Sequence, residues 1–310
     1  MKIFRNIKDV KEIKNPVVTI GTFDGVHLGH RAVFDVMKQE AKRLHGETVV
    51  ITFYPHPRIV LGTKTPENLK FINTQERKIK LIEEAGIDNL IIIEFTKDFA
   101  KNSSEFFIKE FIVKYINPKM IIVGYDHHFG RNRHGSFELL VKTGKQSGFE
   151  VKRVEPLIID GVTVSSTLIR KLLKEGKIKE ANKFLGYEYS ITGKVVHGNG
   201  IGKTIGYPTA NIEISNEYKL ITANGVYVCR VEEAGKIYGG MGNIGYRPTI
   251  NDDKFTIEVN IFDFDKDIYD EIITIYFVDR LRNEIKFDSL EALKRQLAQD
   301  EINARKILES

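Results

Sequence analysis

Short apolar runs alternate with amphipathic segments over about the first 185 residues of the chain. Apolar runs of this length are typical of strands that are buried on both faces, and helical periodicity fills the gaps between them. Strands that alternate with helices at this spacing predict βαβ units and a parallel sheet. The predicted strands are residues 17–20, 49–53, 90–95, 120–123 and 151–154. The predicted helices are residues 30–44, 74–85, 104–115 and 137–147, with two short ones at 167–175 and 178–184 that close the domain.

The pattern changes after residue 186. Residues 189–280 are rich in Gly, Tyr, Thr, Val and Ile, with turns at strand-length intervals and little helical periodicity. This pattern predicts an antiparallel β-barrel. Helical periodicity returns from residue 288 onward, so we expect a terminal helix packed on the barrel. The predicted fold is therefore α/β plus β, with a Rossmann-like domain at residues 1–185 and a β-barrel domain at 186–310.

Composition narrows the class of protein only slightly. The chain of 310 residues has 47 basic and 42 acidic residues, and its net charge of +5 suits an anionic substrate as well as nucleic acid. Apolar runs are too short for a membrane span, and the first residues lack the apolar core of a signal peptide. The single cysteine, Cys229, lies in an alternating run, which indicates packing within a strand. We expect a cytoplasmic protein that binds neither membrane nor nucleic acid.

The first candidate site follows the first long strand. The segment Gly-Thr-Phe-Asp-Gly-Val-His-Leu-Gly-His occupies residues 21–30 and leads into a helix. Ligands of α/β sheets bind at the carboxyl ends of strands, where a glycine turn meets a helix N-terminus. Gly21 and Gly25 allow close approach of the backbone to phosphate oxygens, and His27 and His30 share one face of the first helical turn. Two imidazoles there would stabilise charge on a phosphorus under attack.

Residues 21–30 resemble the signature of the nucleotidyltransferase superfamily. Three further segments lie at the sheet edge that would face a nucleotide: Phe-Tyr-Pro-His-Pro at 53–57, Val-Gly-Tyr-Asp-His-His-Phe-Gly at 123–130, and Val-Ser-Ser-Thr-Leu-Ile-Arg at 164–170. Together they resemble the adenylyltransferase half of the bacterial bifunctional riboflavin kinase/FMN adenylyltransferase family. The resemblance implies that His27 and His30 are catalytic and hold the ATP phosphates.

The same resemblance implies a set of binding residues for nucleotide and flavin: Gly21, Phe23, Asp24, Gly25, His56, Asp126, Ser165, Ser166, Thr167 and Arg170. Each has a structural alternative. Residues 165–167 can be a helix cap, Asp126 can cap a turn, His56 can shape its loop, and Arg170 can be a solvated helix residue.

A second candidate site opens the barrel. Residues 193–206 contain five glycines, enough for a loop whose backbone amides approach phosphates closely. This loop is not a Walker A motif, because no Gly-Lys-Ser/Thr follows at the required spacing into a helix. The segment Pro-Thr-Ala-Asn at 208–211 follows, and the block resembles the riboflavin kinase signature. Further matches lie at residues 224–227, 242–249, 256–259 and 277–282, so the resemblance covers essentially the whole chain.

The kinase resemblance implies that Glu258 accepts the proton of the riboflavin hydroxyl, and that Thr209 and Asn211 bind Mg²⁺ and phosphates. Glu258 alternates with apolar residues of its strand, which is equally typical of a solvent-facing glutamate. The implied ATP- and flavin-binding residues are Gly193, Gly198, Gly202, Lys203, Gly206, Pro208, Thr209, Asn211, Arg247 and Arg282, although Arg282 can also be an ordinary surface arginine.

The chain departs from the family pattern at a few positions. His127 and His128 stand where an acidic-aromatic pair and a basic residue are common, and Leu168 stands where arginine is common. Lys203 also replaces an arginine, which keeps the charge and loses the planar fork. Asp270 stands where glycine is common.

The function implied is a two-step enzyme. Riboflavin kinase makes FMN from riboflavin and ATP, and the adenylyltransferase joins AMP from a second ATP to FMN, which gives FAD and pyrophosphate. Mg²⁺ is the expected cofactor, and the expected partners are riboflavin, FMN, FAD, ATP and a weakly associated second copy of the chain. One alternative is a single-activity FMN adenylyltransferase whose barrel only binds flavin. Another is a flavin- or RNA-binding regulator, although the lysines are scattered among glutamates and form no basic stripe.

Overall fold

The computed structural model describes residues 1–62, 65, 68–125, 136–198, 200–247 and 254–309. Contacts divide the chain into two compact units, Met1–Ser166 and Thr167–Ser310. That residues 1–185 and 186–310 form separate domains stays a prediction. By contact, the helices α7 (Ser166–Lys174) and α8 (Ile178–Leu185) group with the second unit, apart from Ser166 itself.

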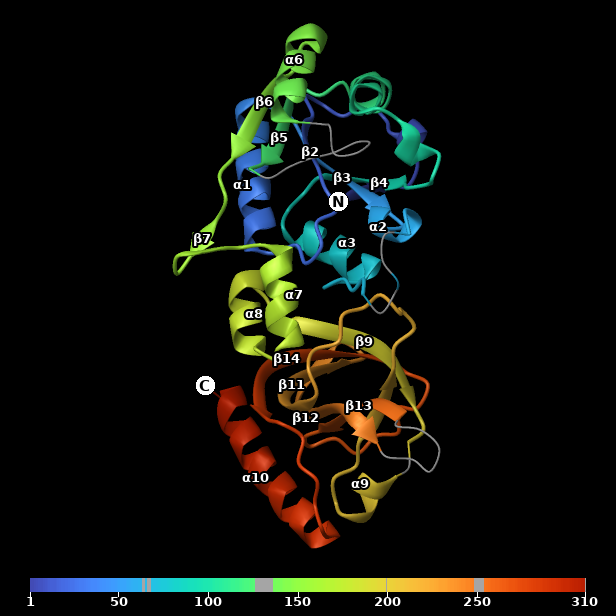
Figure 1. Ribbon diagram of the computed structural model, residues 1–310, viewed down its shortest axis with the longest axis vertical. Helices are drawn as coiled ribbons and strands as arrows, with labels where there is room; N and C mark the ends of the chain where they lie inside the picture. The colour runs from blue at the N-terminus through green and yellow to red at the C-terminus, as the bar shows by residue number, and fades with distance from the viewer. Residues whose placement is uncertain (63–64, 66–67, 126–135, 199, 248–253, 310) are drawn as a thin grey trace. The chain divides into compact units, whose positions relative to one another are not determined.

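A six-stranded parallel sheet forms the centre of the first unit (Figure 1). Its strand order is β1-β4-β3-β2-β5-β6, so the order reverses at β2, which pairs with both β3 and β5. The strands are β1 (Lys2–Phe4), β2 (Val17–Ile20), β3 (Thr48–Tyr54), β4 (Asn89–Glu94), β5 (Met120–Gly124) and β6 (Glu150–Val154). The five predicted strands are confirmed within a residue or so at each end, whereas β1 was not predicted.

Helices cover the sheet, and β2, β3, β4 and β5 are therefore buried along nearly their whole length. Strands buried in this way need apolar residues on both faces. The long helices are α1 (Leu28–Arg43), α3 (Gln75–Glu84) and α6 (Phe137–Ser147), as the periodicity predicted. Short elements complete the unit: η1 (Ile7–Asp9), α2 (Pro57–Val60), η2 (Phe99–Lys101), and a hairpin of β7 (Ile158–Ile159) with β8 (Val162–Thr163).

One predicted α-helix is wrong in kind. Residues 104–115 fold as α4 (Ser104–Phe106), a π-helical segment η3 (Phe107–Val113) and α5 (Lys114–Ile116). The rings of Phe107 and Phe111 both pack edge-on against Phe99, at centroid distances of 5.7 and 5.2 Å. The wider turn of a π-helix changes which residues face the sheet, and periodicity in sequence does not report it.

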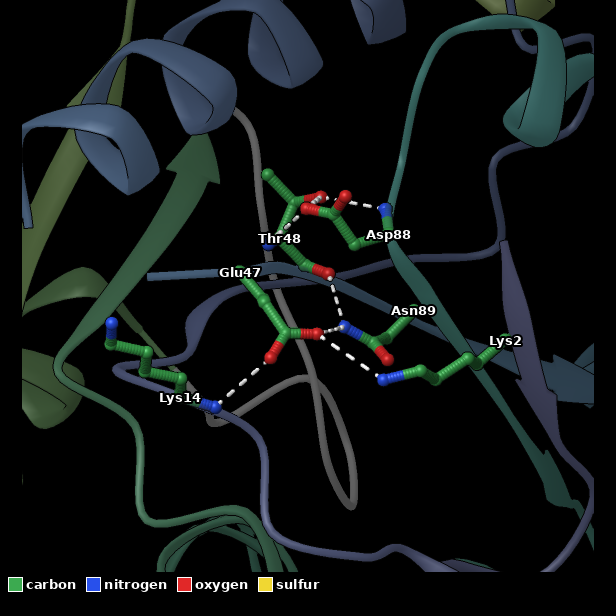
Figure 2. A network of polar contacts seen from close by, with 6 residues as sticks. All are labelled: Lys2, Lys14, Glu47, Thr48, Asp88 and Asn89. Atoms are coloured by element: carbon green, nitrogen blue, oxygen red, sulfur yellow. Dashed lines mark hydrogen bonds and ion pairs between the residues drawn. The ribbon is translucent and has the colours of Figure 1, made fainter. Parts of the chain in front are cut away.

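Polar residues fasten the amino ends of β3 and β4 to each other (Figure 2). The carboxylate of Asp88 accepts hydrogen bonds from the backbone N–H of Thr48 at 2.9 Å and from its hydroxyl at 2.8 Å. The buried amide of Asn89 donates to Glu47 at 3.1 Å and to the Thr48 carbonyl at 3.2 Å. Glu47 also pairs with Lys2 of β1, at 3.7 Å. These contacts fix the register of the strands at their amino ends. The carboxyl ends of the same strands, where ligands of α/β sheets usually bind, take no part in this network.

The second unit is a closed antiparallel barrel in the order β10-β13-β12-β11-β14-β9, with β9 paired to β10 (Figure 1). Its elements are β9 (Tyr189–Val196), α9 (Ile201–Thr204), β10 (Ala210–Glu213), β11 (Gly225–Glu233), β12 (Lys236–Arg247), β13 (Lys254–Ile261), β14 (Ile272–Arg282) and α10 (Leu290–Glu309). The helix α10 packs on β11, β12 and β14, where Ala304 joins Val228, Met241 and Phe262 in one apolar cluster. The predicted barrel and terminal helix are confirmed.

Cys229 is fully buried within β11, and burial raises the pKa of its thiol. The prediction that this cysteine is a packing residue agrees with its position. None of the described helices combines the length and the apolar run needed to span a bilayer.

Candidate active sites

The loop between β2 and α1 lies where the strand order of the sheet reverses, the usual ligand position in an open α/β sheet. Three of its residues have left-handed backbone angles, with φ of 48° at Phe23, 90° at Gly25 and 37° at Val26. Phe23 and Val26 are buried, so tertiary packing holds conformations that cost free energy for residues with a Cβ. Packing of the buried Phe23 and Val26 therefore holds the shape of this loop.

His27 and His30 stack on each other at the N-terminus of α1. Their ring centroids are 3.6 Å apart with an angle of 16° between the planes, and the backbone N–H of His30 donates to Nδ1 of His27 at 3.3 Å. Burial, and then the neighbouring His27 and Lys78, hold the pKa of His30 well below its usual value. A neutral imidazole at pH 7 offers one N–H donor, and Nδ1 of His30 is buried with no hydrogen-bond partner among the described residues. The predicted common face of the two histidines is confirmed.

Asp24 and Ser166 connect the histidine loop to distant segments. One carboxylate oxygen of Asp24 accepts from the backbone N–H groups of Ile72 at 2.9 Å and Asn73 at 3.4 Å. The hydroxyl of Ser166, at the start of α7, donates to the Asp24 carbonyl at 2.8 Å. These contacts bring two of the predicted binding residues together with the loop, and they give Asp24 a structural task in addition to the predicted one.

Other predicted residues of this site lie at element ends. His56 is the N-cap of α2, accepts from the N–H of Arg58 at 3.1 Å and packs on Phe71 with centroids 4.2 Å apart. Arg170 donates to the Thr167 hydroxyl at 3.4 Å on α7, and Ser165 precedes that helix. A Cβ on Gly21 would lie 2.8 Å from the Phe23 ring, so the glycine is required for the loop to fold back. Asp126, His127 and His128 lie outside the described residues.

Lys78 is a residue of this site that the sequence reasoning missed. It is 7% exposed, and its ammonium donates to the Thr22 carbonyl at 3.3 Å and to the Thr52 hydroxyl at 3.2 Å. Burial lowers its pKa to about 8, and the nearby Asp24 partly opposes that shift. The signal was present in the sequence, because Lys78 precedes Leu81 and Ile82 by three and four positions and so lies on the apolar face of α3.

In the barrel, Glu258 lies at the centre of a polar row that crosses three strands. Its neighbours in register are Asn211 of β10 and Asn243 of β12. The Thr209 hydroxyl donates to one oxygen of the Glu258 carboxylate at 3.2 Å, and the Thr256 hydroxyl donates to the other at 3.3 Å. The three predicted chemical residues of the barrel, Thr209, Asn211 and Glu258, therefore lie together.

A cavity of about 300 Å³ borders this row, a size at the lower end of small-molecule sites. Thr209, Glu258 and Arg282 line its polar side, with Asn243 and Asn260. The segment after β14 and the helix α10 supply its apolar wall, together with the loop before β10: Ile205, Tyr207, Ile285, Phe287, Leu293 and Leu297. An apolar wall facing a few convergent polar groups is typical of a site for a ring system with a polar tail.

The glycines before β10 let the chain pass close to the polar row. A Cβ on Gly198 would lie 2.1 Å from the amide nitrogen of Asn211, and one on Gly202 would lie 2.2 Å from the Tyr207 carbonyl. Gly206 has φ of 86°, and two residues later the carbonyl of Pro208 accepts from Asn260 at 2.7 Å. Gly193 contacts β10 equally closely, since a Cβ there would lie 2.5 Å from the Glu213 carbonyl. Replacing Gly198 or Gly202 would therefore move residues of the site.

The predicted basic residues of the barrel differ in their surroundings. Arg282 reaches the cavity, but its guanidinium pairs with the buried carboxylate of Asp300 on α10, with a shortest distance of 2.7 Å. Lys203 is exposed on α9. Arg247 ends β12, and its side chain lies outside what the structure describes. Contact of Arg282 with a flavin phosphate stays a prediction.

Comparison with known proteins gives a family match for each half of the chain. Residues 9–168 match the family model described as FAD synthetase, and residues 185–308 match the one described as riboflavin kinase. The chain is 36% identical to the bifunctional riboflavin kinase/FMN adenylyltransferase of Haemophilus influenzae, over all of both chains. The enzyme of the same description from Escherichia coli K12 is 35% identical, over 98% of this chain and 97% of the other. The chain belongs to this family.

A solved structure also matches over nearly the full length. It is described as a macrolide-efflux protein from Streptococcus pneumoniae, is 35% identical, covers 98% of each chain and superposes with a TM-score of 0.89. The two-unit architecture of the family is thus shared by a protein that carries a different description.

One departure from the family pattern, Asp270, leaves the backbone of its turn in the conformation that glycine would adopt. Asp270 stands where glycine is common, and its φ of 66° is the left-handed conformation that favours glycine and tolerates aspartate. Its carboxylate pairs with Lys194 at 2.6 Å, which holds the turn beside β9. The turn therefore keeps a backbone suited to glycine. Leu168 is half-buried on α7, where its effect on flavin contacts stays a prediction.

Proposed function

We propose that this chain carries out two successive steps of flavin-cofactor synthesis. The barrel transfers the γ-phosphate of ATP to the 5′-hydroxyl of riboflavin, and the parallel-sheet unit transfers AMP from a second ATP to FMN. Membership of the family and the match of each half to one activity support both steps. The observations that support it most are the stacking of His27 on His30 at the N-terminus of α1 and the grouping of Thr209 and Asn211 around Glu258 in the barrel.

In the kinase step, the 5′-hydroxyl oxygen of riboflavin bonds to the γ-phosphorus of ATP, and ADP leaves. Glu258 accepts the proton of that hydroxyl. The support is its half-buried position at the rim of the cavity, where Thr209 and Thr256 hold both carboxylate oxygens in place. A positioned base of this kind is worth roughly 10²–10⁴ in rate. The glycine turns that include Gly198 and Gly202 bring backbone N–H groups to the phosphates.

Mg²⁺ is the metal that suits this site. The described residues contain no group of three His, Cys, Asp or Glu side chains that could enclose a metal by itself. Mg²⁺ needs no such cage, because it keeps several waters and binds mainly through substrate phosphates and one or two protein oxygens. The Thr209 hydroxyl and the Asn211 amide oxygen fit that role, and the ion would neutralise charge on the transferred phosphate.

In the adenylyl step, an FMN phosphate oxygen bonds to the α-phosphorus of ATP and the bond to pyrophosphate breaks. No proton has to move at the phosphorus, so the residues position groups and stabilise charge. His27 and His30 would donate hydrogen bonds to the phosphates from the N-terminus of α1, whose dipole favours anions. Ser165, Ser166, Thr167 and Arg170 would bind a phosphate at the start of α7, and His56 would flank the base or flavin.

The setting of the enzyme is also a proposal. A single buried cysteine and no described membrane-spanning helix are compatible with our proposal of a cytoplasmic location. Weak self-association and the absence of nucleic-acid binding stay predictions.

Chromatography of the flavins tests the function. Purified protein is incubated with riboflavin, ATP and Mg²⁺, and the flavins are separated over time. FMN that rises first, followed by FAD, is the expected result. No FMN from riboflavin, with FAD formed when FMN is supplied, would refute the kinase assignment and favour the single-activity alternative. FMN without FAD would refute the assignment of the histidine site.

A further inference from the structure

Lys78 lies on α3, yet its ammonium reaches the start of the histidine loop on another element. Thr22, whose carbonyl it holds at 3.3 Å, directly precedes Phe23, the first residue of the loop with a left-handed backbone. The second contact, 3.2 Å to the Thr52 hydroxyl, anchors the ammonium to β3. The Thr52 hydroxyl also approaches the Thr22 carbonyl at 3.5 Å, the limit of a hydrogen bond. One buried cation thus ties the loop to the strand beside it.

A buried lysine is costly to maintain, which makes its presence informative. Removing an ammonium from water costs several kcal/mol unless it is well hydrogen-bonded, and methionine or leucine would fill the same space without that cost. Lys78 is only 7% exposed, and its contacts go to backbone and hydroxyl oxygens of the site. Hydrogen bonds from a charged donor are stronger than neutral ones, so they hold the Thr22 carbonyl more firmly than the Thr52 hydroxyl alone.

We propose that Lys78 is a positioning residue of the adenylyltransferase site, which fixes the Thr22 carbonyl and thereby holds His27 and His30 toward the nucleotide. The inference rests on the proposed adenylyl step. It assigns the residue no contact with substrate. It predicts that loss of Lys78 slows the chemical step more than it weakens the binding of FMN.

The charged groups around Lys78 give the inference a second, independent readout. Asp24 of the loop attracts the ammonium, and the ammonium in turn acts on His30 of α1. The positive charge of Lys78 helps to keep His30 neutral. Burial brings the pKa of Lys78 to about 8, so the free enzyme loses this charge within an accessible pH range. A neutral amine donates weaker hydrogen bonds, and kcat/KM reports the free enzyme.

The test compares Lys78→Met and Lys78→Arg with Lys80→Met. Lys80 is exposed on the same helix, so its substitution makes the same chemical change away from the site. FAD formation from FMN and ATP is measured across pH, and FMN formation from riboflavin by the same samples controls for the amount of active protein. Each variant is also checked for cooperative thermal unfolding.

We expect Lys78→Met to lower the kcat of FAD formation by about 10–100-fold, the scale of a small misplacement of catalytic groups, with little change in the KM for FMN. The decline of kcat/KM near pH 8 should appear in the wild type and be absent in Lys78→Met. Lys78→Arg should recover part of kcat and also lack the decline, because arginine keeps its charge. FMN formation and the Lys80→Met variant should match the wild type.

Thr52→Val replaces Lys78→Met as the test if Lys78→Met does not unfold cooperatively and so is not properly folded. It removes one partner of the ammonium and should move the decline of kcat/KM to lower pH, because a less solvated ammonium loses its proton more readily. Unchanged kcat and an unchanged pH profile in Lys78→Met, or in Thr52→Val where that variant decides, would overturn the inference. Wild-type protein that makes no FAD would instead refute the proposed adenylyl step, so the two failures are distinguishable.

Discussion

The ion pair between Arg282 and Asp300 joins the last barrel strand to the terminal helix, and its removal provides a quantitative test. Three N–O contacts of 2.7, 3.0 and 3.1 Å connect the two groups, and Gln296 donates to the same carboxylate at 2.9 Å. The side chains are only 15% and 3% exposed. Arg282→Met would leave the Asp300 carboxylate buried without its cation, which costs about 3–5 kcal/mol in proteins.

A matched control lies on the same helix. Arg305 pairs with Asp263 and with Glu301, each at 2.9 Å, but the three side chains are 39%, 78% and 28% exposed. Exposed pairs contribute little because water and salt screen them, and a methionine at position 305 would still cover Phe262. We therefore expect Arg305→Met to leave the stability of the barrel nearly unchanged.

Thermal unfolding, followed by circular dichroism and by loss of kinase activity, measures the difference. At roughly 2–4 °C per kcal/mol for a unit of this size, Arg282→Met should lower the midpoint of the barrel transition by about 10 °C. Equal midpoints for Arg282→Met and Arg305→Met would refute the reasoning, because a large loss of stability is expected only where the carboxylate left behind is buried. Asp300→Asn, which keeps the shape and removes the charge, should fall between the two.

Three further predictions concern the chemistry and its pH dependence. Glu258→Gln keeps the hydrogen-bonding shape but cannot accept a proton, so FMN formation should fall by roughly 10²–10⁴ while FAD formation from supplied FMN is unchanged. His30→Ala should lower the kcat of FAD formation by about 10²-fold or more and leave the kinase intact. Because burial holds the pKa of His30 well below its usual value near 6.5, the unfolded chain binds a proton there that the native chain does not. The free energy of unfolding of the first unit should therefore fall as pH drops below about 6.5, and His30→Ala should lose that part of the slope.

Each of these has its own contrary result. A Glu258→Gln enzyme with normal FMN formation would leave the barrel without an assigned base. Equal loss of both activities in His30→Ala would indicate misfolding and not a role in adenylyl transfer. An unfolding free energy with the same dependence on pH in wild type and His30→Ala would mean that His30 is protonated equally in both states.

Much of the architecture could be predicted because its signals are local. The strands of the first unit, the helix that begins after His27, and the barrel pattern each show in repeats of two to four residues, and periodicity reports them directly. The prediction failed where packing decided the outcome. The aromatic cluster of Phe99, Phe107 and Phe111 accompanies a π-helix that no periodicity indicates. The short strand β1 was also missed, because its three residues form a strand only by pairing with β4.

The sequence by itself determined the candidate residues of both sites, because histidine spacing, glycine turns and the order of motifs can be read along the chain. Only the tertiary structure decided how distant residues complete each site. Lys78 reaches Thr22 from a separate helix, Asn211 lies opposite Glu258 through strand register, and Asp300 captures Arg282 from the terminal helix. Free energies of burial and pairing depend on neighbours in space, and neighbours in space are set by the fold as a whole.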